Sequence, residues 1–569
     1  MEKIIISTKQ ALPNEIKTGF YAQLFIVALI CTLYTREMFN ANLFYPDSSH
    51  LMLDGFLIAD YLRDTVNNGF NNPMDYAIRY FGQYPALSIG YKPPLWPAIQ
   101  SVFILIFGEE SWAMRLALLG LAIFVGIAIF RTVERGSGVF LAWAAASLAI
   151  SIPYLVQWGW YAMTELSAVA FVLSAGWPFC RYLEDGRQRN LAYMVILLAA
   201  GVWCKQTAAV GALWLFIATL LSLGPKETFR RREVWLAMAG YAVLIMPVIW
   251  LTIEFGKKNI AQSIGFDSAS TSIFVAPISN ILKYIRLLFG EQLTHLFFAL
   301  AIGGILVAAY RLYQGVSQGE GRNIILYFSL IVATYLFFTL INGENPRYTV
   351  FWLPAFGFFV AYLINELRRF LPTFIAAGAV LALLALNVMQ AFAMGPSQTT
   401  GMAQAAQYIA SNINYPIIMI DSYVNEQFIY FMRKMDPQRK FWTIRSDKVL
   451  SMAPMSPTSR NVVELAKSEG DIKNILLKYG IKYLVVDRHY QMKIPIHNTL
   501  RKYVSSGDFR LLYEIPVTSQ NTYRYKVNKP IQIYEFLKWQ PAKSNTITIQ
   551  VPIVGKSFTV PLDAKWQKN

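Results

Sequence analysis

Long apolar runs without charge alternate with short polar loops up to about residue 395 of the chain. Runs such as 302–309 and 376–388 are continuous and show no period of two, so they predict helices rather than barrel strands. Their number predicts about eleven transmembrane helices. The expected spans lie near residues 20–34, 112–130, 139–155, 166–180, 191–202, 210–223, 234–253, 296–310, 324–341, 350–364 and 374–392.

Basic residues gather in short loops between alternate runs, and this arrangement orients the predicted bundle. Lys3, Lys9 and Lys17 precede the first run, so the positive-inside rule places the N-terminus in the cytoplasm. One run, 95–107, would reverse the orientation of every later basic loop. We therefore interpret 93–108 as a helix that lies at the outer interface or dips into it, within a first outer loop that extends from about residue 36 to residue 111.

The pattern changes after about residue 395, where charges become frequent and apolar runs become short. Runs at 417–420, 483–486, 531–536 and 546–551 are typical of strands, and 472–479 is typical of an amphipathic helix. The sequence thus predicts a transmembrane domain over 1–395 and an α/β domain over 396–569. Because the predicted number of spans is odd and the N-terminus is cytoplasmic, the α/β domain is expected outside the cytoplasm. The predicted fold class is a polytopic α-helical membrane protein with outer juxtamembrane helices and a C-terminal extracytoplasmic α/β domain.

Composition agrees with this fold class. The 569 residues are 55% hydrophobic and 15% charged, whereas about a quarter of the residues of soluble domains are charged. The net charge of +17 is compatible with nucleic-acid binding, but the basic residues lie in loops that set topology, so no nucleic-acid partner is expected. The cysteines Cys31, Cys180 and Cys204 are not clustered, which argues against a disulfide framework or a zinc site.

The predicted topology also places a set of polar side chains from four loops at the outer membrane face. Lys205 is the member that most favours a functional role, because it lies at the outer tip of an apolar hairpin, where a charge needs a partner or a function. The whole set is Asp47, His50, Asp54, Lys92, Glu165, Lys205, Arg347 and Tyr348.

Several members of this set also have a purely structural interpretation. Asp47 has the sequence context of a cap for a helix over 48–64, in which Leu51, Gly55, Ile58 and Leu62 would face lipid. Lys92, flanked by aromatic residues, has the features of an interfacial anchor, and Glu165 those of a solvated carboxylate at a helix N-terminus. Arg347 has an alternative partner in Glu344.

The order of these residues resembles that of the GT-C superfamily of polyprenyl-phosphate-sugar glycosyltransferases. Within it, the chain looks like the branch that holds protein O-mannosyltransferases and the bacterial aminoarabinose transferase of lipid A. The resemblance covers about residues 20–395, and the C-terminal domain matches only in kind. The similar segments are Pro46-Asp47 with Leu53-Asp54-Gly55, Lys92-Pro93-Pro94-Leu95, Phe107-Gly108-Glu109 with Arg115-Leu116, Gly201 to Lys205, and Arg347-Tyr348 with Pro354.

The chain departs from the family pattern at three positions. Ser48 follows Asp47 where many relatives have a second acid, which weakens a metal site in the first loop. Glu165 stands where the family usually has Asp. Tyr91 precedes Lys92 where the aminoarabinose transferase has Glu, which argues against that particular sugar specificity.

The resemblance implies an inverting membrane glycosyltransferase. It would transfer a hexosyl or pentosyl unit from a polyprenyl-phosphate sugar to an extracytoplasmic lipid, glycan or protein acceptor. Asp47 would be the general base, and Glu165 would orient the acceptor or Asp47. Donor phosphate would be bound by Lys92, Lys205, Arg347 and Tyr348, with support from His50 and Asp54.

The same resemblance implies a bacterial inner-membrane location, with the N-terminus cytoplasmic and the C-terminal domain periplasmic. No cofactor is expected, and a divalent cation, although compatible with the chemistry, is not expected to be required. The main alternative is a transporter or flippase for a lipid or polysaccharide. Transporters usually carry ionisable groups or broken helices at mid-depth, whereas the polar set here lies at one face. A sensor or scaffold would not account for Lys205 or the loop carboxylates.

Overall fold

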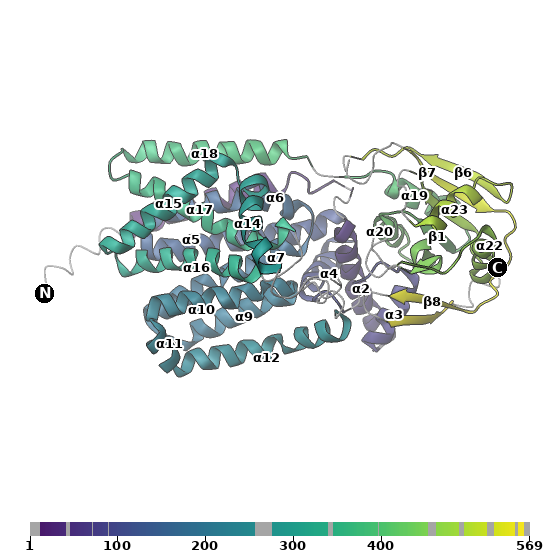
Figure 1. The fold of residues 1–569 in the computed structure, drawn as a ribbon, viewed down its shortest axis with the longest axis horizontal. Helices are drawn as coiled ribbons and strands as arrows, with labels where there is room; N and C mark the ends of the chain where they lie inside the picture. Colours follow the sequence, from purple (N-terminus) through teal and green to yellow (C-terminus); the bar gives the residue numbers. More distant parts are fainter. Residues whose placement is uncertain are drawn as a thin grey trace.

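Figure 1 shows an elongated molecule with a bundle of long helices at one end and the strands at the other, and with α2, α3 and α4 between them. The computed structural model describes residues 12–40, 42, 46–70, 72–88, 90–256, 276–339, 345–395, 398–452, 462–488, 494–519, 529–551 and 556–562.

Nine segments of the described chain are long and apolar enough to cross a membrane. They confirm a polytopic helical membrane protein. The elements that form them are α1 (Leu12–Tyr34), α5 (Ser111–Ile150), α7 (Thr164–Ser174) with α8 (Gly176–Asp185), η2 (Gln206–Ala209) with α10 (Val210–Leu223), α12 (Arg232–Phe255), α15 (His295–Gln314), α16 (Gln318–Thr339), η4 (Pro346–Trp352) with α17 (Leu353–Leu367), and α18 (Thr373–Ala393).

Two further crossings bring the described segments to the predicted number. Helix α5 bends at Gly138, where φ is 82°. A side chain added at Gly126 would contact Ile150, although an unbroken helix would hold these residues about 36 Å apart, so α5 folds back as two arms. The 17-residue α9 (Gln188–Cys204) accounts for the other predicted span.

The helices α2 (Pro46–Asn68), α3 (Pro73–Gln83) and α4 (Leu95–Phe107) are the expected juxtamembrane elements. With 13 residues, α4 is about 20 Å long, too short for a hydrocarbon core of about 30 Å. It packs on α2, where Gly55 meets Gln100 and Ile104. Our expectation that Leu51 and Gly55 face lipid is therefore wrong, because Leu51 is 1% exposed and α4 covers Gly55. Apolar side chains of α4 remain exposed at Val102, Leu105, Ile106 and Phe107.

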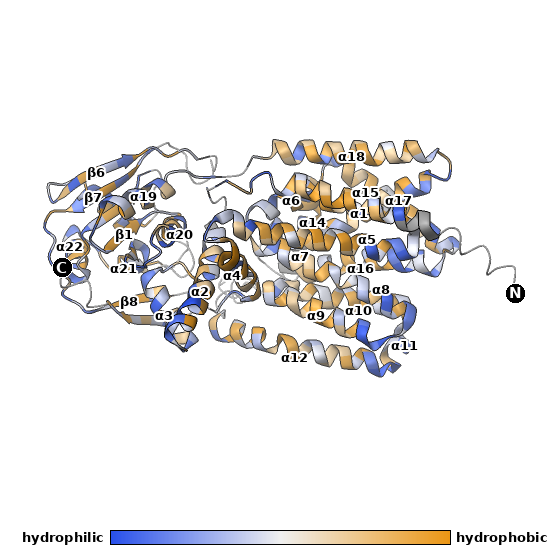
Figure 2. Cartoon of the chain, turned by 180° about the vertical axis from the view of Figure 1, so that it is seen from behind, coloured by the Kyte–Doolittle hydropathy of each residue, from blue (hydrophilic) through white to orange (hydrophobic). Residues whose placement is uncertain are grey.

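Shorter helices complete the bundle, and hydropathy divides its surface. In Figure 2 hydrophobic residues dominate the long helices, while hydrophilic residues gather around α11, at the end from which the N-terminus extends. This is the distribution that basic topology-setting loops produce. The shorter elements are α6 (Pro153–Trp160), α11 (Pro225–Arg230), α14 (Ala276–Leu287) and η3 (Leu288–Gln292).

The C-terminal part is built on a five-stranded sheet of order β2-β1-β5-β7-β6. Strand β1 is parallel to β2 and β5, and β7 is antiparallel to β5 and β6. Each strand predicted from the sequence is present. The elements are α19 (Met402–Asn412), β1 (Ile417–Asp421), α20 (Asn425–Met435), β2 (Trp442–Arg445), α21 (Ser446–Val449), β3 (Ser451–Met452), β4 (Val463–Glu464), α22 (Glu469–Tyr479), β5 (Tyr483–Asp487), α23 (Pro495–Tyr503), β6 (Phe509–Ile515), β7 (Ile531–Phe536), β8 (Thr546–Val551) and β9 (Lys556–Pro561).

Buried ion pairs fasten this α/β part to α2. Arg433 of α20 is 1% exposed and contacts Asp60 at 2.6 Å and Glu109 at 3.1 Å. Arg439 forms two hydrogen bonds to Asp64, at 2.7 and 2.8 Å. Because such paired charges are costly to separate, α2 and the α/β part are held together. The division into domains over 1–395 and 396–569 stays a prediction.

The orientation of the bundle can be measured by cysteine labelling. Gln188 at the start of α9 and Ser506 after α23 are both exposed. In a chain whose three native cysteines are replaced by alanine, we expect an impermeant maleimide to label Ser506→Cys in intact cells. We expect Gln188→Cys to react only after the membrane is opened. The reverse pattern would show that the basic loops were assigned to the wrong side.

Candidate active site

A chain of ion pairs joins charged residues from four segments at the end of the bundle nearest α2. Lys205 Nζ lies 2.7 Å from Glu165 Oε1. Arg347 Nε lies 3.6 Å from the same oxygen, and Arg347 Nη1 lies 3.2 Å from Asp47 Oδ2. The structure thus brings together two predicted carboxylates and two predicted cations that are far apart in the sequence.

Asp47 is positioned by the segment that enters α2. It lies in the first turn of that helix, where the helix dipole favours a carboxylate. The hydroxyl of the next residue, Ser48, donates to the carbonyl of Tyr161. Upstream, the buried Arg115 donates to the carbonyls of Glu37 at 2.7 Å and Met38 at 3.1 Å. The Arg-Leu segment that entered the family resemblance therefore has a structural role here, which is to hold the first loop in place.

Lys205 lies at a break between two helices. Its φ and ψ of −158° and 128° are extended values between α9 and η2. The preceding turn packs closely, since a side chain added at Gly201 would meet Val172 at 2.9 Å. The next residue, Gln206, donates to the carbonyl of Tyr91 at 2.9 Å and so ties this tip to the segment that carries Lys92.

Glu165 is almost fully buried, with 1% of the residue exposed. It lies in the first turn of α7. Its Oε1 accepts from Lys205, whereas the buried Oε2 has no hydrogen-bond partner among the described residues. A buried carboxylate oxygen normally has a partner, so this atom is free to accept a hydrogen bond from a bound molecule.

Aromatic rings surround the two cations. Lys205 Nζ lies 5.3 Å from the centre of the Tyr348 ring, and Arg347 Cζ lies 5.6 Å from it. Arg347 Cζ is also 6.0 Å from the Trp158 ring. Such contacts favour a cation in place. Trp158 belongs to an aromatic segment before Glu165, and its sequence gave no sign of this contact.

Lys92 completes the positive charge around Asp47. Burial alone would raise the pKa of Asp47, but Lys92, Arg347 and His50 act against burial and hold that pKa well below its usual range. In the same way, burial acts to lower the pKa of Lys92, yet Asp47 more than compensates and the pKa of Lys92 is raised. Asp47 is therefore an anion and Lys92 a cation at neutral pH.

His50 and Asp54 hold the backbone that leads to Lys92. The Nδ1 atom of His50 contacts the carbonyl of Ala86, and Asp54 Oδ1 accepts from the Ser88 N–H at 2.8 Å. Burial raises the pKa of Asp54 in spite of that hydrogen bond. Both residues thus contact the backbone that leads to Lys92, and their supporting role stays a prediction. Glu344, the alternative partner for Arg347, lies outside the described residues.

The α/β part contributes charged side chains to this region that were not predicted from the sequence. Glu426 of α20 lies 3.5 Å from His50 Nε2 and 3.1 Å from Arg445 Nη1. The side chains of Glu426 and Arg445 are at least nine-tenths buried. In the sequence they look like ordinary solvated charges of an amphipathic helix and a strand end, so no local signal identifies them.

No group of three or more His, Cys, Asp or Glu side chains in the described chain is arranged to hold a metal ion. The expectation that no divalent cation is required stays a prediction.

The low pKa of Asp47 has a consequence for pH dependence. If ionised Asp47 is required, kcat/KM should show no loss from its protonation between about pH 8 and pH 5, because its pKa lies below the usual value of about 4. Lys92→Met removes one lowering influence, so the pKa of Asp47 rises and the acid limb moves to higher pH. We would measure kcat/KM against pH for both proteins. An acid limb at the same pH in both would contradict this electrostatic arrangement.

Comparison with known proteins places this site in a known fold. Residues 91–251 match the family model described as dolichyl-phosphate-mannose-protein mannosyltransferase, a segment that includes Lys92, Glu165 and Lys205. Curated protein sequences give no match.

Solved structures are similar over most of the chain. ArnT from Cupriavidus metallidurans in the apo state has a TM-score of 0.54 at 13% identity, with 92% of this chain and 99% of that chain covered. The same protein bound to undecaprenyl phosphate has a TM-score of 0.53 at 13% identity, with 90% and 97% covered. An Archaeoglobus fulgidus oligosaccharyltransferase in complex with Zn and sulfate has a TM-score of 0.52 at 13% identity, with 82% and 68% covered.

These likenesses show the GT-C fold, so the predicted fold class is confirmed. The matched segment adds the class of enzyme. The chain thus combines the GT-C fold with a segment that matches a glycosyltransferase family model, in agreement with the resemblance noted in the sequence.

Proposed function

We propose that the chain transfers a sugar from a polyprenyl-phosphate donor to an extracytoplasmic acceptor, with inversion at the anomeric carbon. The observation that carries this proposal is the joint placement of Asp47 and Glu165 with Arg347 and Lys205 at one end of the bundle. The structure of ArnT with undecaprenyl phosphate supports a donor of this lipid class.

The cations serve the leaving group. As the bond from the anomeric carbon to the phosphate oxygen breaks, its electron pair passes to the phosphate, which gains negative charge. Lys92, Lys205 and Arg347 are already held near one another before the reaction, with Tyr348 against two of them. Preorganised positive charge of this kind stabilises a transition state more than mobile water does.

Asp47 serves the nucleophile. The acceptor hydroxyl or amine forms a bond to the anomeric carbon from the side opposite the phosphate and gives its proton to Asp47. While Arg347 pairs with Asp47, that carboxylate is a weak base. A donor phosphate that draws Arg347 and Lys92 toward itself removes this influence and raises the pKa of Asp47. Donor binding therefore prepares the base.

Glu165 has a separate task in this scheme. Its Oε1 orients Lys205 and Arg347, and through Arg347 it fixes the position of Asp47. Its free Oε2 accepts a hydrogen bond from a hydroxyl of the sugar or the acceptor.

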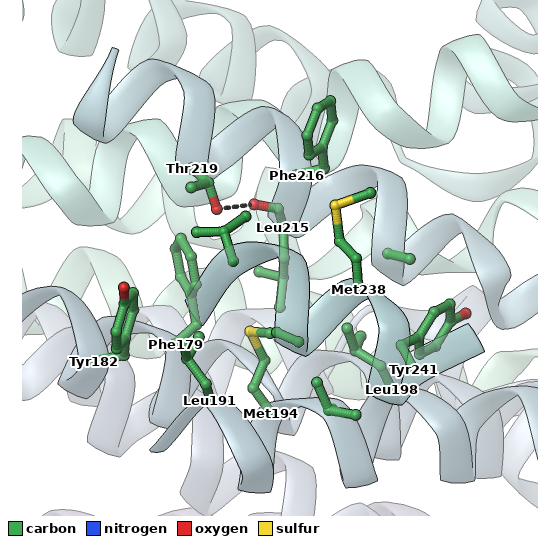
Figure 3. A pocket seen from close by; sticks show the side chains of 14 residues that line it. Phe179, Tyr182, Leu191, Met194, Leu198, Leu215, Phe216, Thr219, Met238 and Tyr241 are labelled. Atoms are coloured by element: carbon green, nitrogen blue, oxygen red, sulfur yellow. Dashed lines mark hydrogen bonds between the residues drawn. The ribbon is translucent and has the colours of Figure 1, made fainter. Parts of the chain in front are cut away.

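An apolar groove lies between α9, α10 and α12. Figure 3 shows Met194 and Leu198 of α9, Leu215 of α10, and Met238 of α12 around it. Leu198 precedes Lys205 by seven residues, about 10 Å along the helix. A polyprenyl chain whose phosphate is bound at Lys205 can therefore follow α9 into this groove.

Mass spectrometry of envelope lipids, glycans and glycoproteins tests the proposal. We expect cells without the protein to lose one sugar-modified component and to accumulate a polyprenyl-phosphate sugar. The wild-type gene should reverse both changes, and Asp47→Asn should reverse neither. Identical spectra with and without the protein would refute the proposal. Full restoration by Asp47→Asn would instead favour a transporter, which moves a lipid without needing a base.

A further inference from the structure

A second cavity lies about 25 Å from Asp47, measured along α2. It is partly open to solvent, has a volume of about 460 Å³, and is lined by the end of α2, by α3, and by β2 and β9 of the α/β part. It plays no part in the ion-pair chain described above. Its lining side chains come from both parts of the molecule, so the cavity exists only because the α/β part is docked on α2.

The lining combines aromatic rings with planar polar groups. Tyr76, Tyr80 and Trp442 supply the rings, and those of Tyr76 and Tyr80 are stacked with centres 6.1 Å apart. Asn68 and Arg79 lie at exposed positions of the wall. Aromatic faces together with flat hydrogen-bonding groups match the two surfaces of a sugar ring, which presents C–H bonds on its faces and hydroxyls around its edge.

Part of this wall is already fixed. Asp64 accepts from both terminal nitrogens of Arg439, and the Tyr76 hydroxyl donates to Asp64 at 2.7 Å while accepting from Arg439 at 2.8 Å. The charges of Asp64 and Arg439 cancel within the wall. The cavity is therefore preorganised, and Arg79 is left as a lining charge that this pair does not neutralise.

Other donors in the wall are not used. Trp442 is 8% exposed, and its indole N–H has no hydrogen-bond partner among the described residues. Among the described residues, Asn68 makes no side-chain hydrogen bond and Arg79 makes no ion pair. The Arg79 Nε–H donates a hydrogen bond of 3.4 Å to the Asp75 carbonyl. An indole N–H in the lining that lacks a protein partner can donate to a bound molecule. A ligand that offers several hydroxyl oxygens would supply partners to these donors.

We propose that this cavity is a carbohydrate-binding site that holds a sugar unit of the acceptor, remote from the reacting end. The acceptor is then an extended glycan or a glycan-bearing molecule, long enough to reach from the cavity to Asp47. The identity of the ligand as acceptor rests on the proposed function, whereas sugar binding does not. An extended peptide is the alternative ligand, and the test below separates it from a sugar.

Binding is tested directly with the full chain in lipid nanodiscs, which avoid sugar-based detergents. The probes are maltotetraose, mannotetraose and chitotetraose, titrated by calorimetry. We expect at least one to bind, and Arg79→Ala to weaken it about tenfold through loss of a charge-assisted hydrogen bond. Asn68→Trp, which fills the cavity from an exposed position, should abolish binding. Tyr513→Ala changes an exposed tyrosine on β6, outside the cavity, and should have no effect.

The outcomes separate this inference from the proposed function. Absence of binding by all three sugars at about 10 mM, or binding that Asn68→Trp leaves unchanged, overturns the inference. So does binding of an unglycosylated serine-rich peptide in their place, with the same loss in Arg79→Ala. If a sugar binds as expected and Asp47→Asn cells still carry the modified component, the cavity assignment stands and the proposed function fails.

Kinetics provide a second test once the acceptor is known. Because the cavity is remote from the reacting atoms, it contributes equally to ground state and transition state. Arg79→Ala should therefore raise KM for the glycan acceptor and leave kcat unchanged. With a truncated acceptor that cannot reach the cavity, wild type and variant should have the same KM. A fall in kcat with either acceptor would show that the residue acts on the reaction centre instead.

Discussion

Replacement of Asp47 by asparagine is expected to lower kcat by about 10²- to 10⁴-fold, the usual contribution of a positioned general base. Asparagine keeps the shape of the side chain, so fold and donor binding should be retained. The natural control is Asp54→Asn, which lies two turns along the same helix. There the asparagine oxygen can still accept the Ser88 N–H, so we expect a much smaller loss.

Both variants would be compared by turnover with saturating donor and by their thermal unfolding midpoints. Near-normal turnover of Asp47→Asn together with an inactive, folded Asp54→Asn would mean that the base is Asp54. Equal unfolding midpoints for Asp47→Asn and wild type are needed before its loss of turnover can be read as chemical.

Lys205→Met is expected to lower kcat by about 10²- to 10³-fold, the usual effect of removing one preorganised charge-stabilising group. The methionine keeps most of the apolar stem. The structure adds one complication, because Lys205 is also the 2.7 Å partner of the buried Glu165. Removal of the lysine alone leaves a buried carboxylate with Arg347 as its remaining cation, which can reduce stability.

The double variant Lys205→Met with Glu165→Gln separates these roles. It removes both charges and leaves the site with the same net charge as before. If Lys205 only neutralises Glu165, the double variant should regain stability and reach the turnover of Glu165→Gln alone. If Lys205 binds the donor phosphate, stability should return while kcat stays well below that of Glu165→Gln alone. Recovery of wild-type turnover in the double variant would remove Lys205 from the phosphate site.

If Lys92 and Lys205 bind the same donor phosphate, a double variant gives a further prediction. Effects of Lys92→Met and Lys205→Met should be less than additive in the double variant, because the two charges act on one group. Full additivity would show that they act on separate groups.

The apolar runs allowed the bundle and the strands to be predicted because each depends on local pattern. Strands β1 and β5 were found because they are buried on both faces and therefore continuously apolar. The cover that α4 places over Gly55 could not be found in this way. An apolar face looks the same in sequence whether it meets lipid or another helix, so Leu51 and Gly55 were assigned to the wrong environment.

The site was predictable as a set of residues but not as a set of pairs. The predicted topology places Asp47, Glu165, Lys205 and Arg347 at one face. It does not predict that Arg347 forms ion pairs with Asp47 and Glu165. That choice follows from packing between segments whose separation in sequence carries no pattern. Glu426 was missed for the same reason, because its burial depends on the docking of the α/β part on α2.

The pairing of Asp47 with Arg347 joins residues 300 positions apart, and this separation has a consequence for biosynthesis. A growing chain enters the membrane from its N-terminus, so the first loop with Asp47 is delivered long before η4. Until the segment Pro346–Leu367 has been inserted, neither Asp47 nor Glu165 has its arginine. A nascent or truncated chain therefore displays Asp47 without the arginine that pairs with it, and the proposed sugar transfer has to wait until synthesis has passed Arg347.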